Sequence, residues 1–194
     1  MARPAAGGAL LPVDSLSASA YEDLRRCPYR FFAFRQLGLR EADEIDAELD
    51  KRDFGNWLHQ VLRQFHEDLR ADWQPPGAGR LARLEAAAAD VTRTLGLAED
   101  EFLPFAAAWP QARDGYLAWL AGHEAKEGAV FEQAESEREM QLGPVKLVGR
   151  IDRVDRLGDG RAMVMDYKTE PRATTAERVR LPAEDTQLAF YAAL

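Results

Sequence analysis

Two apolar runs joined by a glycine-rich turn constrain this chain more than any other feature. Residues 145–157 and 161–169 are rich in β-branched and apolar side chains, which favour strands. Gly158-Asp159-Gly160 between them is typical of a three-residue hairpin loop. With that loop length, the register places Asp152 directly opposite Asp166, with Cβ atoms about 5 Å apart.

Opposed carboxylates repel each other across a strand pair, and a divalent cation would relieve the repulsion. Oxygen ligands suit Mg²⁺ or Mn²⁺. Lys168 lies two residues beyond Asp166 and therefore shares its face, where it would orient a water molecule or stabilise charge on a phosphate. The alternative is an ordinary solvated face of an amphipathic hairpin, and a register slip of one residue would reverse the faces.

The strongest helix by periodicity is Asp53–Arg70, with an apolar stripe at i, i+3, i+4 and i+7 spacing. His59 lies beside this stripe and Gly55 lies one turn earlier, which would allow another backbone or a ligand to approach closely. A lone helical histidine is more often a surface or core residue, but His59 is also placed to face an interior site. His66 falls on the polar side, and no role is assigned to it.

Further helices are predicted over 80–95 and 111–126, within a helical insertion at 72–128. The period then changes to that of a strand at Val130–Leu142, which carries four glutamates. Glu135 and Glu137 are both candidates to approach a metal, and the pattern does not choose between them. A final helix over 184–194 places Gln187 and Tyr191 on one face as i, i+4 partners.

Near the N-terminus, Ser19 and Glu22 fit a capping box that opens a helix, and Pro28 is expected to interrupt it. A basic and aromatic run follows this start. Its arginines either form a local phosphate-binding surface or simply face water while the aromatic side chains enter the core. The run comprises Arg25, Arg26, Tyr29, Arg30, Phe31, Phe32, Phe34, Arg35 and Arg40. The acidic stretch 41–51 is expected to be exposed or mobile.

Composition narrows the class of protein. The 194 residues suit one domain, with 1–13 as a flexible lead and 14–194 folded. One cysteine and no export signal fit the reducing cytoplasm, and no apolar run is long enough for a membrane span. A net charge of −8 argues against a generic basic nucleic-acid coat. The absence of a phosphate-cradling glycine loop makes nucleotide hydrolysis unexpected.

Four motifs occur in an order that resembles the PD-(D/E)XK nuclease superfamily, and most closely the nuclease domain of RecB/AddB-type recombination proteins. The motifs are Gly55 with His59, Gly149-Arg150-Ile151-Asp152, Asp166-Tyr167-Lys168-Thr169, and Gln187 with Tyr191. The opening Cys27-Pro28-Tyr29 adds to the AddB-type resemblance. The resemblance implies a restriction-endonuclease-like α/β core, a small mixed sheet flanked by helices, with a helical insertion. The helical part would cover about 14–128, and the catalytic sheet with its following helix about 129–194.

The resemblance also implies a role for each motif. Asp152 and Asp166 would bind Mg²⁺ or Mn²⁺ with His59 as a further ligand, and Lys168 would be the catalytic lysine. Gln187 and Tyr191 would line the site and help to hold DNA or Lys168.

Two departures from the family pattern concern the ends of the chain. AddB-type domains use a cysteine at the Cys27 position with three more near the C-terminus to hold a 4Fe–4S cluster, and those three do not occur here. Cys27 is then an orphan ligand or a buried thiol, and a cluster would require a longer protein. The end at Leu194, where this fold usually adds a strand, indicates a C-terminally incomplete fragment.

These observations predict metal-dependent hydrolysis of DNA phosphodiester bonds by an exonuclease or endonuclease, within a double-strand-break repair and recombination protein. The resemblance implies DNA and a helicase-nuclease partner subunit or domain as the partners. The first alternative is a non-catalytic DNA-binding or scaffolding module that keeps the fold. The second is a metal enzyme acting on other phosphate esters.

Overall fold

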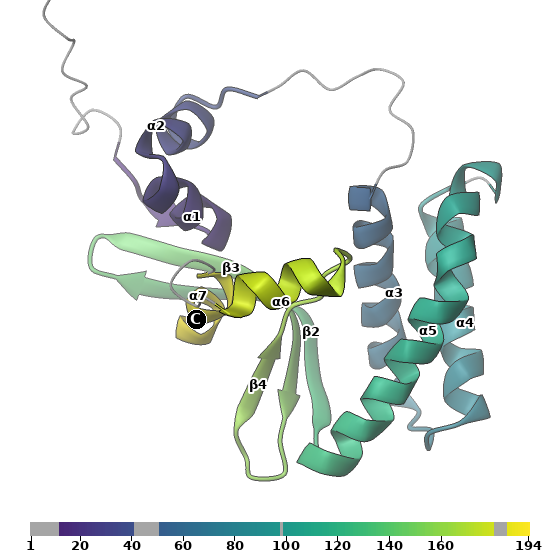
Figure 1. Ribbon diagram of the computed structural model, residues 1–194. Coiled ribbons are helices and arrows are strands. Elements are labelled where there is room, and N and C mark those ends of the chain that lie inside the picture. Colours follow the sequence, from purple (N-terminus) through teal and green to yellow (C-terminus); the bar gives the residue numbers. More distant parts are fainter. Residues whose placement is uncertain (1–11, 41–50, 98, 181–185) are drawn as a thin grey trace, which may run out of the picture. The chain divides into compact units, whose positions relative to one another are not determined.

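A mixed sheet carries the hairpin and the glutamate-bearing strand. Its order is β1-β3-β2, and β4 pairs with β3. β1 (Ser15–Leu16) runs parallel to β3 (Val145–Arg156), and β4 (Ala162–Met165) runs antiparallel to it; β2 spans Val130–Leu142, as predicted. Helices together with this sheet confirm the predicted α/β class (Figure 1).

The computed structural model describes residues 12–40, 51–97, 99–180 and 186–194. By contacts the chain divides into two compact units. Unit 1 comprises 1–43, 137–150 and 177–194, and unit 2 comprises 44–136 and 151–176. β2 and β3 therefore each contribute residues to both units.

The hairpin of β3 and β4 has the predicted register. Arg153 lies opposite Met165, and the pairing continues to Arg156 opposite Ala162. The Leu157 amide donates to the Arg161 carbonyl at 2.9 Å, and Gly160 has the positive φ of 86° that the three-residue loop requires. The ladder ends at the pair Arg153 and Met165, so Asp152 and Asp166 follow directly after its last pair. Asp152 is only 9% exposed, so the hairpin is not a solvated charged face.

Helices α3 (Lys51–Ala71), α4 (Ala78–Thr94) and α5 (Glu99–Glu127) lie side by side in unit 2 (Figure 1). The first two match the predicted ranges. α5 begins well before the predicted Gln111, because aromatic packing stabilises its early turns: the Phe102 ring lies 4.8 Å from Trp57 and the Phe105 ring 5.0 Å from Phe54. No helix in the described part of the chain combines the length and apolar character that crossing a bilayer needs.

The apolar stripe of α3 packs against α4 and α5, which accounts for the helical core of unit 2. Fully burying one valine, leucine or phenylalanine side chain stabilises the fold by roughly 1.5–3 kcal/mol. The most deeply buried members are Trp57, Val61, Phe65, Leu84 and Leu120.

Unit 1 contains α1 (Ala18–Arg26), α2 (Pro28–Phe31), a π-helical turn η2 (Phe32–Gln36) and α7 (Gln187–Ala193). The predicted cap at Ser19 is wrong: Ser17 precedes the helix, and its Oγ accepts the Ala20 amide at 3.2 Å. The break at Pro28 is confirmed, since Cys27 is extended and Pro28 opens α2. α6 (Arg172–Arg180) follows the Asp166–Thr169 segment and was not among the predicted helices.

The basic and aromatic run divides between core and surface. Phe31 is buried, whereas Tyr29 and Phe34 are exposed. Arg30 and Arg35 both pair with Asp23, at 2.9 Å each. The predictions for 1–11, for 41–50 and for the start of the last helix at 184–185 lie outside the described residues.

Candidate metal centre

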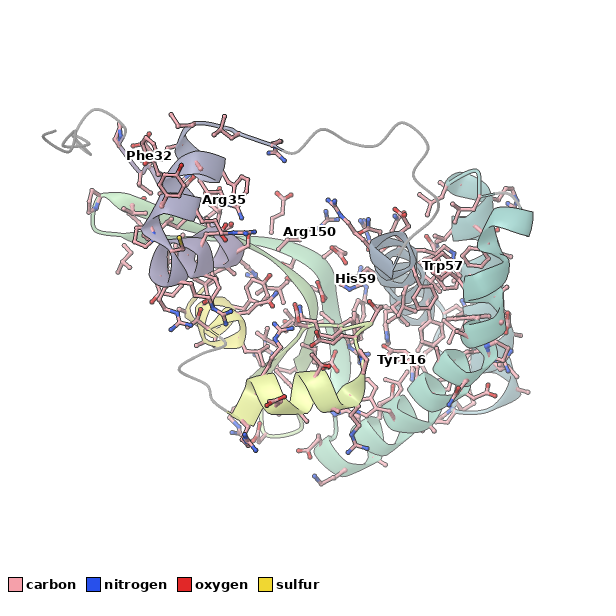
Figure 2. All side chains as sticks on the ribbon, turned by 45° about the horizontal axis from the view of Figure 1, so that its top comes forward. Phe32, Arg35, Trp57, His59, Tyr116 and Arg150 are labelled. Atoms are coloured by element: carbon pink, nitrogen blue, oxygen red, sulfur yellow. The ribbon has the colours of Figure 1, made fainter. Side chains whose placement is uncertain are left out.

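Three side chains from three elements of unit 2 converge on one point. His59 comes from α3, Glu135 from β2 and Asp152 from β3, and one ligand atom from each lies within 4.8 Å of the other two. His59 Nδ1 is 3.4 Å from Asp152 Oδ1 and 3.6 Å from Glu135 Oε1. Figure 2 shows His59 and Trp57 leaving α3 on different sides, with Trp57 on the side of α4 and α5. The helix therefore buries one stripe and presents the histidine to the strands.

Glu135 reaches the site through an unusual backbone conformation. Its φ is 49°, in the left-handed region that residues other than glycine rarely adopt, and it lies in the middle of β2. Such a residue interrupts the alternation of a strand and redirects its side chain, as in a β-bulge. The structure therefore brings Glu135 to the site, whereas Glu137, the other candidate, belongs to unit 1. Sequence alternation alone could not choose between them.

The carboxylates of Asp152 and Glu135 attract positive charge to the position of His59. Hydrogen bonds with Asp152 and Glu135, opposed by burial, raise the pKa of His59 to about 10, so its ring is protonated at neutral pH. A nitrogen and two carboxylates are donors that Mn²⁺ and Mg²⁺ accept. Two donor atoms that bind the same Mg²⁺ are at most about 4.2 Å apart, since each bond to the ion is about 2.1 Å long. The three side chains fit such an ion after a small contraction.

Asp166 and Lys168 form an ion pair next to this group, with Nζ 2.5 Å from Oδ2. Burial raises the pKa of Asp166, the Lys168 ammonium opposes the rise, and the Asp152 carboxylate adds to it. The negative charge of Asp152 thus disfavours a second negative charge on Asp166. Asp166 is not a member of the group formed by His59, Glu135 and Asp152 among the described side chains.

Gly55, one turn before His59, lies against the end of the Asp166–Thr169 segment. A Cβ built on Gly55 would lie 3.5 Å from Thr169 Oγ1, an ordinary van der Waals contact. The expected close approach is present, but it leaves room for a methyl group.

A buried polar cluster of unit 2 lies outside the sequence predictions. His66, expected on the polar side of α3, is only 2% exposed, so that expectation is wrong. α3 is covered on a second side, where His66 stacks on the Phe131 ring at 4.9 Å and contacts Arg153 Nη1 at 2.7 Å. A stripe defined by apolar residues alone does not reveal this second buried face.

Gln187 and Tyr191 belong to unit 1, where Gln187 Nε2 donates to the Tyr191 hydroxyl at 3.1 Å. Gly149 is required beside them, because a Cβ there would lie 3.2 Å from the Tyr191 ring and closer still to Leu194 Cδ1. Both side chains line a pocket of about 410 Å³. Three arginines also line it: Arg26, Arg150 and Arg178.

Cys27 is exposed, so the expectation of a buried thiol is wrong. An iron–sulfur cluster of the Cys₄ type needs four thiolates, and the chain has one cysteine. The residues present here do not fit that cluster.

The mixed α/β fold brings a histidine and two carboxylates together beside an Asp-x-Lys segment, an arrangement that includes residues of three of the four motifs. The chain belongs to the PD-(D/E)XK nuclease superfamily, whose sequence profile matches residues 15–194. The resemblance expected from the four motifs is thereby confirmed.

Among its relatives is the B subunit of the ATP-dependent helicase/deoxyribonuclease of Streptococcus mutans, 33% identical over 175 residues, which covers 83% of this chain and 15% of that protein. The protein of the same name from Desulforudis audaxviator is 28% identical and covers 84% of this chain and 16% of its own length. An uncharacterized protein of Rickettsia felis is 43% identical over 27% of this chain and 6% of its own length. The chain thus spans only a small part of these relatives.

Proposed function

We propose that this chain is a Mg²⁺- or Mn²⁺-dependent deoxyribonuclease module that hydrolyses phosphodiester bonds in DNA. The convergence of His59, Glu135 and Asp152 beside the Asp166–Lys168 pair is the observation that carries the proposal. Membership of the nuclease superfamily supports it. The names of the Streptococcus and Desulforudis relatives support a place in a helicase-nuclease, with a helicase subunit or domain as partner. A role in double-strand-break repair and recombination is proposed from the family resemblance alone.

In this proposal His59, Glu135 and Asp152 hold the cation, and Asp166 is a further acidic ligand. A bound divalent ion would supply the positive charge that polarises the scissile phosphate. His59 must give up its proton to act as a ligand, because only the neutral imidazole has a lone pair for a metal.

Lys168 is proposed as the catalytic lysine. Its ammonium lies against Asp166, which fixes a positive charge at the edge of the acidic group. A fixed positive charge at that position stabilises the negative charge that develops on the phosphate oxygens during hydrolysis.

Gln187 and Tyr191 are proposed to contact the DNA from unit 1. The pocket that they line also carries arginines, and guanidinium groups are well suited to phosphate oxygens. This local basic surface is compatible with an overall charge of −8.

The decisive experiment measures cleavage of linear single- and double-stranded DNA by the full chain with Mn²⁺, Mg²⁺ or EDTA. Lys168→Ala and Asp152→Asn are expected to lose roughly 100-fold or more in rate. Lys126→Ala is the matched control, because that lysine is 82% exposed and pairs only with its neighbour Glu127 among the contacts described. Equal cleavage by wild type and Lys168→Ala refutes the catalytic proposal. DNA binding without any cleavage supports the scaffolding alternative instead.

A further inference from the structure

The segment that carries Asp166 and Lys168 lies beyond the paired part of β4. The ladder between β3 and β4 ends with Arg153 opposite Met165. Asp166 is the next residue, so the site segment does not inherit its position from regular sheet pairing. Other contacts must therefore hold it.

Tyr167, the residue between Asp166 and Lys168, is held at both ends. Its backbone amide donates to Asp152 Oδ2 at 2.7 Å, and its hydroxyl lies 3.0 Å from the Tyr116 hydroxyl of α5. The Tyr167 ring also meets the His59 ring edge to face, at 5.7 Å between centroids. One side chain thus links the site segment to the helical core.

Tyr116 is in turn bound by the buried guanidinium of Arg153, whose Nη1 donates to the Tyr116 hydroxyl at 2.8 Å. Arg153 is 1% exposed and forms a bidentate pair with Asp155, at 2.6 and 2.7 Å. Asp155 also accepts a hydrogen bond from His123 Nε2 at 3.0 Å. Asp155 and Tyr116 thus both bind the buried guanidinium of Arg153. Its position is fixed, because moving it would break several charge-assisted hydrogen bonds.

The chemistry of the guanidinium fixes the direction of the hydrogen bonds that Arg153 makes. Arg153 can only donate, so His66 Nε2, 2.7 Å from Nη1, must accept. The Tyr116 hydroxyl lies 2.5 Å from the same nitrogen and 3.0 Å from the Tyr167 hydroxyl, and either atom of the Tyr116–Tyr167 pair can be the donor. Burial lowers the pKa of His66 well below its usual value, with the Arg153 and Arg80 charges adding to the effect, which agrees with a neutral acceptor.

We propose that Tyr116, oriented by the buried Arg153–Asp155 pair, is a positioning residue that fixes Tyr167 and thereby sets the placement of Asp166 and Lys168. The geometry that points to it is the hydrogen-bonded series Arg153, Tyr116, Tyr167 and the return bond from the Tyr167 amide to Asp152. The catalytic consequence rests on the function proposed above. The structural consequence, a restrained 166–169 segment, does not.

The test uses the complete chain and hydroxyl-deleting substitutions that keep the rings. Tyr116→Phe is expected to reduce kcat about 10- to 100-fold with KM for linear DNA within about twofold, as for residues that orient the ligands of a site. It is also expected to speed hydrogen exchange of the Tyr167 amide roughly tenfold. Tyr167→Phe removes the other hydroxyl of the same pair, so the double variant should be little worse than either single variant.

Thr92→Val is the matched control. It removes a buried hydrogen bond of the same unit, from Trp57 Nε1 to Thr92 Oγ1 at 2.9 Å, and leaves the Tyr116–Tyr167 pair intact. Its kcat and the exchange of the Tyr167 amide are expected to match wild type. A loss in Thr92→Val equal to that in Tyr116→Phe would show a general stability effect and overturn the proposal.

The exchange measurement separates this proposal from the nuclease function. Faster exchange confined to 166–169 in Tyr116→Phe supports the positioning role even if the chain cleaves no DNA. Unchanged exchange there overturns it, even if wild type is an active nuclease. Faster exchange with an unaltered kcat would retain the restraint but refute its catalytic importance.

Discussion

Glu135 adopts a left-handed conformation inside a strand, at a cost of roughly 1–2 kcal/mol, and this conformation directs its carboxylate to His59. We expect Glu135→Gln to weaken Mn²⁺ binding about tenfold or more, because an amide oxygen carries no charge for a divalent ion. Glu137→Gln, two residues along β2, should bind Mn²⁺ as wild type does. Isothermal titration with both variants checks this, and equal affinities would remove Glu135 from the set of ligands.

His66 predicts a particular dependence of stability on pH. Its pKa in the folded state lies well below the 6.5 of the unfolded chain. The unfolded chain therefore binds the extra proton first, and stability falls as the pH falls below about 6.5, by up to about 1.4 kcal/mol per pH unit.

Urea unfolding between pH 6.0 and 5.0 tests this expectation, since His59 with its pKa of about 10 stays protonated in the folded state and is mostly protonated in the unfolded chain there. His66→Gln keeps an acceptor for Arg153 but cannot titrate, so its stability should change less with pH than that of wild type. Equal slopes would show that His66 is not responsible.

At the residue scale, the sequence is sufficient where position depends on regular geometry. The loop length of the hairpin predicts its register, which is observed as far as Arg153 opposite Met165. Asp152 and Asp166 follow that last pair, and the Asp152 carboxylate contributes to the raised pKa of Asp166. The sequence leaves Glu135 as one of two candidates, because a single non-regular φ decides its direction. The prediction for His66 is wrong because its partners come from β2, β3 and α5, far away in the sequence.

At the scale of the elements, two glycines form a matched pair for substitution: Gly122 in α5 and Gly149 in β3. Gly122 lies inside α5, and a methyl group added there would meet nothing within 4 Å, so Gly122→Ala should stabilise the chain by about 0.5–1 kcal/mol. Gly149→Ala should destabilise it by roughly 1 kcal/mol or more, because its Cβ would press on the Tyr191 ring at 3.2 Å. Urea midpoints of the two variants should move in opposite directions, and a shared direction would contradict the packing around Gly149.

Periodicity predicts the elements that bury one long stripe and misses those that do not. α3 and α4 match because their apolar residues repeat over several turns. The predicted α5 is too short because Phe102 and Phe105, which stack on α3, do not form a clear repeat with the residues that follow. β1 has two residues and pairs with a distant part of the chain, which leaves no local pattern to recognise.

At the scale of the molecule, the two hydrophobic clusters found among the described residues predict two regions of local stability. Leu120 is fully buried in the helical cluster of unit 2, and Phe190 is buried in the cluster of unit 1. Each truncation to alanine should cost about 2–5 kcal/mol. Hydrogen exchange should show Leu120→Ala loosening α3, α4 and α5, and Phe190→Ala loosening α1 and α7. If either variant speeds exchange equally in both sets of helices, the clusters unfold as one unit.

The family and the fold class are accessible from sequence because four spaced motifs and a change of periodicity mark them. The division into two contact units is not, since each unit is assembled from segments far apart in the chain. The same is true of the cluster around Arg153, which draws on α3, α5, β3 and the segment after β4.

A tryptophan at the exposed side of that cluster allows its state to be followed by fluorescence. Trp119 is 43% exposed, stacks on His123 at 5.0 Å, and has the Arg153 guanidinium 5.6 Å from its ring. Indole emission responds to nearby charge and to contact with water, so Trp119 is a natural fluorophore placed beside the buried cation. In a variant with Trp57, Trp73 and Trp109 replaced by phenylalanine, its emission would follow the state of the cluster without any attached label.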